Sequence, residues 1–252
     1  MLEQYLSRVE LDRSRIPDTG RYPFCIPAVR GLSSLPLHPK VTFLVGENGT
    51  GKSTLTEAIA VAYGFNAEGG SRNFNFSTFH SESGLWNYLE LVRGVKHPRD
   101  GYFLRAESFY NVATSIEQMD EIPAYAPKIS DSYGGSLHEC SHGESFFALL
   151  NNRLRGHGLY IFDEPEAALS PQRQLAMLCR IHELVKLDSQ LIIATHSPIL
   201  TAYPECTIYE LSTKGIRPVE YEQTDNYRVT REFLNSREKM LRLLLNGGPS
   251  KT

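Results

Sequence analysis

The stretch GENGTGKST, Gly46 to Thr54, combines residue types that bind phosphate groups. It fits the pattern G-x-x-x-x-G-K-[ST] and lies between an apolar run typical of a strand and a run with helical periodicity. Its glycines let backbone N–H groups face phosphate oxygens, Lys52 supplies a positive charge, and the Ser53 hydroxyl is a ligand for Mg²⁺. The nucleotide contacts expected from this motif are Gly46, Asn48, Gly49, Thr50, Gly51, Lys52, Ser53 and Thr54.

Two carboxylates follow the apolar run LYIF, at the end of a second expected strand. Asp163 is placed to hold Mg²⁺, as the strand-end aspartate of P-loop enzymes does, and Glu164 to act as general base for an attacking water. An acidic pair can also be a solvated strand end, but an intact phosphate loop in the same chain favours the catalytic interpretation. His196, after the apolar run LIIAT, is the candidate sensor of the γ-phosphate, so the candidate catalytic residues are Lys52, Glu164 and His196.

The stretch HECSHGES admits two interpretations. His138, Glu139 and His142 spell H-E-x-x-H, a pattern of zinc proteases. Ser141 and Glu144, however, form a capping box before the apolar run SFFALL, which predicts a helix start at Ser141. The first histidine then precedes the helix, whereas the zinc site needs both histidines on one helix face. The metalloprotease interpretation is therefore disfavoured.

Composition limits the class of protein. The chain has 252 residues, enough for a sizeable core, and a net charge of -3, which argues against nucleic acid wrapped over the whole surface but permits a local basic patch. Its four cysteines form no C-x-x-C pair, which suits a reducing compartment. The chain has no apolar run of about 18 residues, and its charged start has no signal-peptide character. We expect a cytoplasmic protein without membrane insertion.

Helices and strands alternate in the pattern that must position these residues. Strands are expected at residues 5–16, 21–29, 40–46, 158–165 and 190–198, and helices at 53–65, 144–154 and 170–187. This alternation implies a mostly parallel sheet, and the early strands imply an additional antiparallel layer. We predict an α/β fold of the P-loop NTPase type.

Two further regions have a different character. Residues 66–136 are rich in Gly, Ser, Asn and aromatics, and we expect an inserted or mobile lobe there, within a single domain of residues 1–252. Near the end, two short strands at 207–211 and 217–221 precede a helix at 230–245. The apolar stripe of this helix is expected to face either the core or a partner, and it consists of Phe233, Leu234, Leu241, Leu244 and Leu245.

The motifs GENGTGKST, SHGES, LYIFDEPEAALSP and ATHSP, in that order, resemble those of ABC-type ATPases. They are most similar to the stand-alone bacterial ATPases related to SMC, RecF and OLD-like heads, often labelled AAA family ATPases. The resemblance implies ATP and Mg²⁺ as cofactors and an ATP-induced head-to-tail homodimer. Ser141, Gly143 and Glu144 would contact ATP across the dimer, Glu166 to Pro171 would be the interface-crossing D-loop, and His196 the switch histidine.

The chain departs from the family pattern in two respects, and one expected residue stays unassigned. His142 stands where the signature normally has glycine. The Q-loop glutamine is not evident, and Glu107 in FLRAESFYN is the candidate substitute as a ligand of metal or water. No aromatic residue is assigned to stack on adenine: Tyr22 and Phe24 are candidates, but an aromatic at either position is more often a core residue.

The resemblance predicts ATP hydrolysis coupled to closure and opening of the dimer. Lys52 and Asp163 are separated by roughly 110 residues without heptads, so the chain lacks the long coiled coil of SMC proteins. We expect an ATPase that drives a nucleic-acid-related, defence or repair process together with a nucleic acid or protein effector. The alternatives are the nucleotide-binding subunit of a membrane ABC transporter, disfavoured by the missing glutamine, and a weakly hydrolysing sensor, disfavoured by an intact Glu164.

Overall fold

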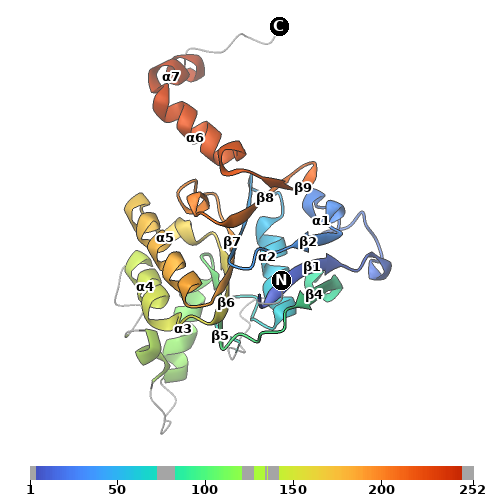
Figure 1. Ribbon diagram of the computed structural model, residues 1–252, viewed down its shortest axis with the longest axis vertical. Helices are drawn as coiled ribbons and strands as arrows, with labels where there is room; N and C mark the ends of the chain where they lie inside the picture. Colours follow the sequence, from blue (N-terminus) through green and yellow to red (C-terminus); the bar gives the residue numbers. More distant parts are fainter. Residues whose placement is uncertain (1–3, 73–82, 121–127, 134, 136–141, 246–252) are drawn as a thin grey trace.

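Two β-sheets with a helix between them form the body of the molecule (Figure 1). The computed structural model describes residues 4–72, 83–120, 128–133, 135 and 142–245. Within this part of the chain, one sheet has six strands and the other three. The predicted α/β P-loop NTPase fold, with a mainly parallel sheet and a separate antiparallel layer, is confirmed.

The large sheet is parallel except for its last strand. In spatial order its strands are β5 (Asp100–Arg105), β6 (Gly158–Asp163), β7 (Gln190–Ala194), β3 (Val41–Gly46), β8 (Cys206–Ser212) and β9 (Gly215–Val219). β9 runs antiparallel to β8. β6 and β7 are buried at every position, which explains their unbroken apolar sequences. The carboxyl ends of β3, β6 and β7 meet at one edge, and the candidate site follows from this arrangement.

The small antiparallel sheet covers α2 (Lys52–Tyr63) from the other side. Its strands are β2 (Ser34–Pro36), β1 (Leu6–Leu11) and β4 (Leu89–Arg93), with β1 in the centre. One apolar cluster joins Val9 of β1, Ile59 of α2 and Ile161 of β6. The helix that follows the phosphate loop is therefore fixed between two sheets.

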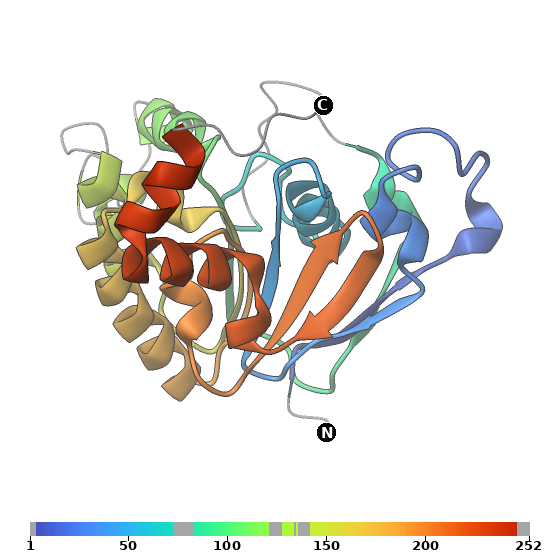
Figure 2. The same cartoon turned by 90° about the horizontal axis from the view of Figure 1, so that it is seen from above.

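Helices α3 (Phe109–Asp120), α4 (His142–Ala148) and α5 (Pro171–Lys186) pack against the opposite face of the large sheet. Figure 2 shows them on one side of the molecule and the N-terminal strands on the other. The start of α4 at His142 agrees with the predicted helix start, and a π-helical turn, Leu149–Arg153, extends it. α5 begins where Ser170 accepts a hydrogen bond from the N–H of Arg173, as the Ser-Pro start signal predicts.

The expected strand at residues 21–29 is wrong. The chain forms turns there, followed by the short helix α1 (Pro27–Gly31), which Pro27 opens at its first position. The apolar pattern suggested a strand, but two prolines in nine residues remove N–H donors that a strand ladder needs. The short 3₁₀ helices span Arg13–Arg15, Leu85–Tyr88, Ile129–Tyr133, Pro165–Ala168, Leu200–Ala202 and Tyr221–Gln223.

The stretch 66–136 contributes to both sheets. From it, β4 pairs with β1, and β5 pairs with β6. Its residues 73–82, 121–127, 134 and 136 lie outside the described part. An inserted lobe within a single domain of residues 1–252 stays a prediction.

Helices α6 (Asp225–Asn235) and α7 (Arg237–Leu245) form an arm that projects from the body (Figure 1). The single helix expected at 230–245 is thus interrupted at Ser236. Neither helix has a buried residue, and Leu234, Leu244 and Leu245 are 72%, 68% and 77% exposed. The core-facing alternative for the apolar stripe is therefore wrong, and the partner-facing one stays a prediction. Among the described helices, none combines the length and apolar character needed to span a bilayer.

Gln190, at the start of β7, ties the N-terminal strand to the large sheet. Its side chain is buried and satisfies four backbone groups. Its Oε1 accepts hydrogen bonds from the N–H groups of Tyr5 (3.1 Å) and Leu6 (2.8 Å). Its Nε2 donates to the carbonyls of Leu6 (2.7 Å) and His38 (3.0 Å). One amide side chain therefore joins three segments that are distant in sequence.

We expect Gln190→Leu to lower the free energy of unfolding by about 4 kcal/mol or more, because it leaves four backbone groups unpaired and each costs about 1–3 kcal/mol. Urea denaturation followed by circular dichroism measures the change. The matched control is Gln223→Leu, at an exposed position, which should change stability by less than about 0.5 kcal/mol. Equal stability of the two variants would contradict the role of Gln190.

Candidate active site

The phosphate loop connects β3 to α2 and depends on two glycines. Gly46 has φ 144°, and a Cβ there would lie 2.2 Å from the carbonyl oxygen of Leu211. Gly51 has φ 99°, and a Cβ there would lie 2.6 Å from Cγ2 of Ile26. Both the backbone conformation and the close neighbours exclude larger side chains. The loop between them places Asn48 and Gly49 at an exposed tip.

Lys52 lies across this loop. Its side chain is almost fully buried, and its Nζ donates to the carbonyl oxygens of Gly46 (2.9 Å) and Glu47 (3.0 Å). Burial lowers the pKa of the Lys52 ammonium, while the carboxylates of Glu164 and Asp163 act in the opposite direction. The ammonium is therefore held beside the loop by two backbone carbonyl groups.

Asp163 ends β6 beside the phosphate loop and is 3% exposed. Burial raises the pKa of its carboxyl to about 7, against the lowering effects of the Arg105 charge and of a hydrogen bond with Ser53. Its Oδ1 is buried without a hydrogen-bond partner among the described residues. A buried carboxylate oxygen without a donor, next to a serine hydroxyl, fits a Mg²⁺ site, because Mg²⁺ prefers oxygen ligands.

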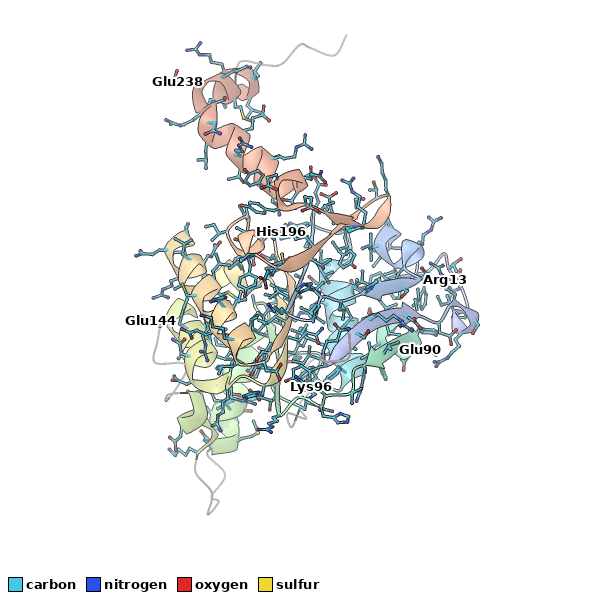
Figure 3. The ribbon with its side chains drawn as sticks, in the orientation of Figure 1. Arg13, Glu90, Lys96, Glu144, His196 and Glu238 are labelled. Atoms are coloured by element: carbon cyan, nitrogen blue, oxygen red, sulfur yellow. The ribbon has the colours of Figure 1, made fainter. Side chains whose placement is uncertain are left out.

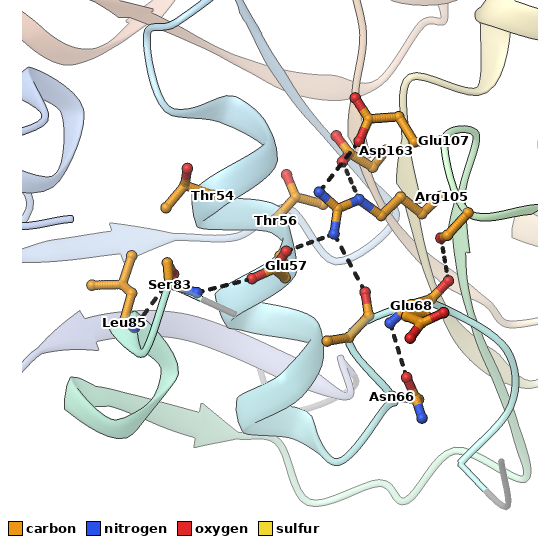
Figure 4. Close-up of polar contacts among 12 residues, drawn as sticks. Thr54, Thr56, Glu57, Asn66, Glu68, Ser83, Leu85, Arg105, Glu107 and Asp163 are labelled. Carbon is orange, nitrogen blue, oxygen red and sulfur yellow. Dashed lines mark hydrogen bonds and ion pairs between the residues drawn. The ribbon is translucent and has the colours of Figure 1, made fainter. Parts of the chain in front are cut away.

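Arg105, at the end of β5, lies between two buried carboxylates (Figure 4). Its Nη1 is 2.6 Å from Oε2 of Glu57 in α2, and its Nε is 3.6 Å from Oδ2 of Asp163. Sequence reasoning missed both Arg105 and Glu57. Neither residue belongs to a motif, and only the fold brings them next to Asp163, the candidate metal ligand.

Glu107 lies on the exposed side of the same group. Its side chain is 81% exposed, and its Oε2 is 3.6 Å from Nη2 of Arg105. Its charge contributes to the raised pKa of Asp163, although less than burial does. Glu107, the candidate substitute for the Q-loop glutamine, therefore lies near Asp163, the candidate metal ligand, and is accessible to solvent.

Glu164 directly follows β6, and its backbone has a left-handed conformation, with φ 51° and ψ 49°. Its N–H donates to the carbonyl of Ala194 (2.9 Å), and its Oε1 is 3.4 Å from Nε2 of His196. The Glu164 side chain is 35% exposed, which leaves room for water beside the carboxylate. The N–H of His196 donates in turn to Oε1 of Glu166 (2.5 Å), the first residue of the expected D-loop. The fold thus brings the expected base and the expected γ-phosphate sensor together.

The expected signature residues lie elsewhere. Gly143 and Glu144 are in the first turn of α4, and Ser141 lies outside the described residues, as do His138 and Glu139. Glu144 is exposed, with its Oε1 3.8 Å from Nη2 of Arg173, and Figure 3 shows it well separated from His196. Within one chain, Glu144 and His196 are therefore apart.

The two adenine-stacking candidates have different surroundings. Phe24 is 7% exposed and packs edge-on against Tyr88, so it is a core residue. Tyr22 is 63% exposed, and its hydroxyl is 3.5 Å from Oγ1 of Thr54 in the first turn of α2. Of these two, only Tyr22 has a ring face open beside the phosphate loop.

We expect Arg105→Leu to lower the free energy of unfolding by about 3–5 kcal/mol, because it leaves buried carboxylates without an opposing charge. The double variant Arg105→Leu/Glu57→Leu should be more stable than Arg105→Leu alone, since it removes one unpaired charge. The control is Arg228→Leu, whose ion pair with Asp225 is exposed and contributes at most about 1 kcal/mol. Urea denaturation tests the series, and an Arg105→Leu variant as stable as the control would refute the proposed charge balance.

Comparison with known proteins shows what the chain is similar to. Residues 26–112 match the sequence profile of a family described as an AAA domain, and no curated protein sequence matches the chain. The SMC head domain from Thermotoga maritima is similar in structure, at 17% identity and a TM-score of 0.46, over 86% of this chain and 100% of that one. The structure of cbiO1 from Clostridium perfringens, part of the ABC transporter complex cbiONQ, is also similar. It has 16% identity and a TM-score of 0.49, over 94% of this chain and 97% of that one. The profile match covers the phosphate loop and Arg105, so this part of the chain is similar to an AAA domain.

Proposed function

We propose that the chain binds ATP and hydrolyses it with the help of Mg²⁺. The observation that carries the proposal is the contact between Glu164 and His196, 3.4 Å apart at the sheet edge that also bears the phosphate loop. A chain that only bound nucleotide would not need a carboxylate and an imidazole paired beside the phosphate position. A general base of this kind typically contributes on the order of 10²–10⁴-fold to the rate.

Each group has a separate role in the proposed reaction. Backbone N–H groups of the loop and Lys52 bind the phosphates. Ser53 and Asp163 would hold Mg²⁺, which would supply positive charge beside the phosphate oxygens. Glu164 takes a proton from the attacking water. His196 orients the γ-phosphate and the base, and Tyr22 stacks on adenine. Glu107 is proposed as an additional ligand of metal or water.

The active form is proposed to be an ATP-induced head-to-tail homodimer. Support comes from the position of Glu144, which lies far from His196 in its own chain but on an exposed surface. Ser141, Gly143 and Glu144 would contact the ATP held by the other copy, and Glu166 to Pro171 would cross the interface. Glu166 already contacts the backbone of His196, so this segment can link the interface to the site.

The process driven by the dimer is proposed to involve a nucleic acid or a protein effector. The motifs ATHSP and DEPEAALSP support this proposal through their similarity to repair and defence ATPase heads. The exposed apolar residues of the arm supply a surface on which an effector can dock.

We expect Glu164→Gln to reduce ATP turnover by on the order of 10²–10⁴-fold while ATP affinity is retained, because the variant keeps size and loses the base. Lys52→Ala is the complementary variant and should lose ATP affinity. Phosphate release and isothermal titration calorimetry measure the two properties separately. Unchanged turnover in Glu164→Gln refutes the assigned base, and unchanged affinity in Lys52→Ala refutes the assigned phosphate loop.

The dimer is tested by the solution mass of Glu164→Gln, measured by light scattering with and without ATP and Mg²⁺. The mass is expected to double only when both are present, because this variant holds ATP without hydrolysing it. Repeating each measurement with a DNA duplex tests whether nucleic acid joins the closed form. A monomer under every condition would contradict the homodimer and would indicate that SHGES needs a different partner subunit.

A further inference from the structure

The base of the arm holds the residues that follow β7. We call residues 195–198 the switch segment, because they include the candidate switch histidine. Asn226, in the first turn of α6, donates from Nδ2 to the carbonyl oxygen of His196 (2.8 Å). Tyr221, just before α6, donates from its hydroxyl to the carbonyl oxygen of Pro198 (2.9 Å). Two side chains from the arm's base therefore bind the backbone of the switch segment.

His196 is restrained through its backbone from two sides. Its N–H is bound by Glu166, and its carbonyl is bound by Asn226. Between these two restraints, the imidazole lies 3.4 Å from the Glu164 carboxylate. His196 therefore contacts both the amide of Asn226, through its backbone, and the expected base Glu164, through its imidazole.

The anchoring contacts of the arm lie at its base, around the start of α6. Thr224, immediately before α6, is 1% exposed, and its hydroxyl donates to the carbonyl of Tyr221 (2.8 Å). The rings of Tyr221 and Tyr227 pack 4.6 Å apart, but no residue of α6 or α7 is buried. The first turn of α6 is anchored at the switch segment, whereas the rest of α6 and α7 is exposed or only half-buried. A displacement of the arm would act first on the contact between Asn226 and His196.

We propose that Asn226 is a positioning residue that aims the imidazole of His196 at Glu164, so that the position of the arm sets the rate of hydrolysis. The inference rests on the proposed ATPase function. Loss of the amide donor frees the peptide plane that follows His196, and the imidazole keeps only one of its two backbone restraints. Nucleotide affinity should not change, because the phosphate loop is held by other contacts.

We expect Asn226→Ala to lower kcat about tenfold, a change of about 1.4 kcal/mol in activation free energy, with an unchanged ATP dissociation constant. In a His196→Ala background the same substitution should change kcat less than about twofold, because residues that act through one contact are not additive. Asn226→Asp keeps the size, removes the donor and should resemble Asn226→Ala. An acidic residue is tolerated in the first turn of a helix, so this variant should fold.

The matched control is Asn235→Ala, an exposed asparagine at the other end of α6, which should leave kcat unchanged. A wild-type rate in Asn226→Ala would overturn the inference while leaving the proposed function intact. So would an equal loss in the wild-type and His196→Ala backgrounds, which would indicate a general structural defect.

A second readout does not depend on turnover. The imidazole ¹H–¹³C signal of His196, assigned by its loss in His196→Gln, is expected to shift in Asn226→Ala and to stay in place in Asn235→Ala. Absence of hydrolysis by the wild-type chain would refute the proposed function, and the imidazole signal would then decide this inference alone. An unmoved signal in Asn226→Ala overturns it.

Discussion

The contact of Arg105 with two buried carboxylates is the interaction on which the site depends. The side chains of Glu57 and Asp163 are 6% and 4% exposed, and a buried carboxylate is costly unless an opposite charge or several donors accompany it. One guanidinium balances only part of that negative charge. Oδ1 of Asp163 has no donor among the described residues, and burial raises the pKa of its carboxyl. A divalent cation at this position would supply the missing positive charge. The excess of buried negative charge therefore fits the proposed Mg²⁺ site.

Strand register makes this contact possible. Arg105 is the register partner of Asp163, and Asp163 is the register partner of Ala194, two residues before His196. Register partners in neighbouring strands place their side chains on the same face of a sheet. A shift of β5 by one residue would move the guanidinium to the opposite face and leave Glu57 unpaired. A shift of β6 by one residue would likewise move the Asp163 carboxylate to the opposite face.

Sequence reasoning succeeded where the chemistry is local and failed where it depends on contacts across the fold. The phosphate loop and the strands ending at Asp163 and Ala194 follow from short patterns, because glycine, apolar runs and a lysine have local consequences. Arg105 and Asn226 could not be found in this way. Each is an ordinary polar residue whose partner lies 30 or more residues away. The strand expected at 21–29 failed for the opposite reason, since a local apolar pattern outweighed the two prolines within it.

The backbone at Glu164 explains how two adjacent carboxylates can perform different tasks. In a regular strand, successive side chains point to opposite faces, so Glu164 would point away from Asp163. The left-handed conformation at Glu164 costs about 1–2 kcal/mol for a residue with a Cβ, and the hydrogen bond from its N–H to Ala194 helps to hold it. This turn directs Glu164 towards His196, where its side chain remains partly exposed, while Asp163 stays buried beside Ser53. A buried carboxylate suits a cation, and a partly exposed one suits a water molecule. The strained residue therefore gives two adjacent carboxylates different surroundings, as the proposed division between metal binding and proton transfer requires.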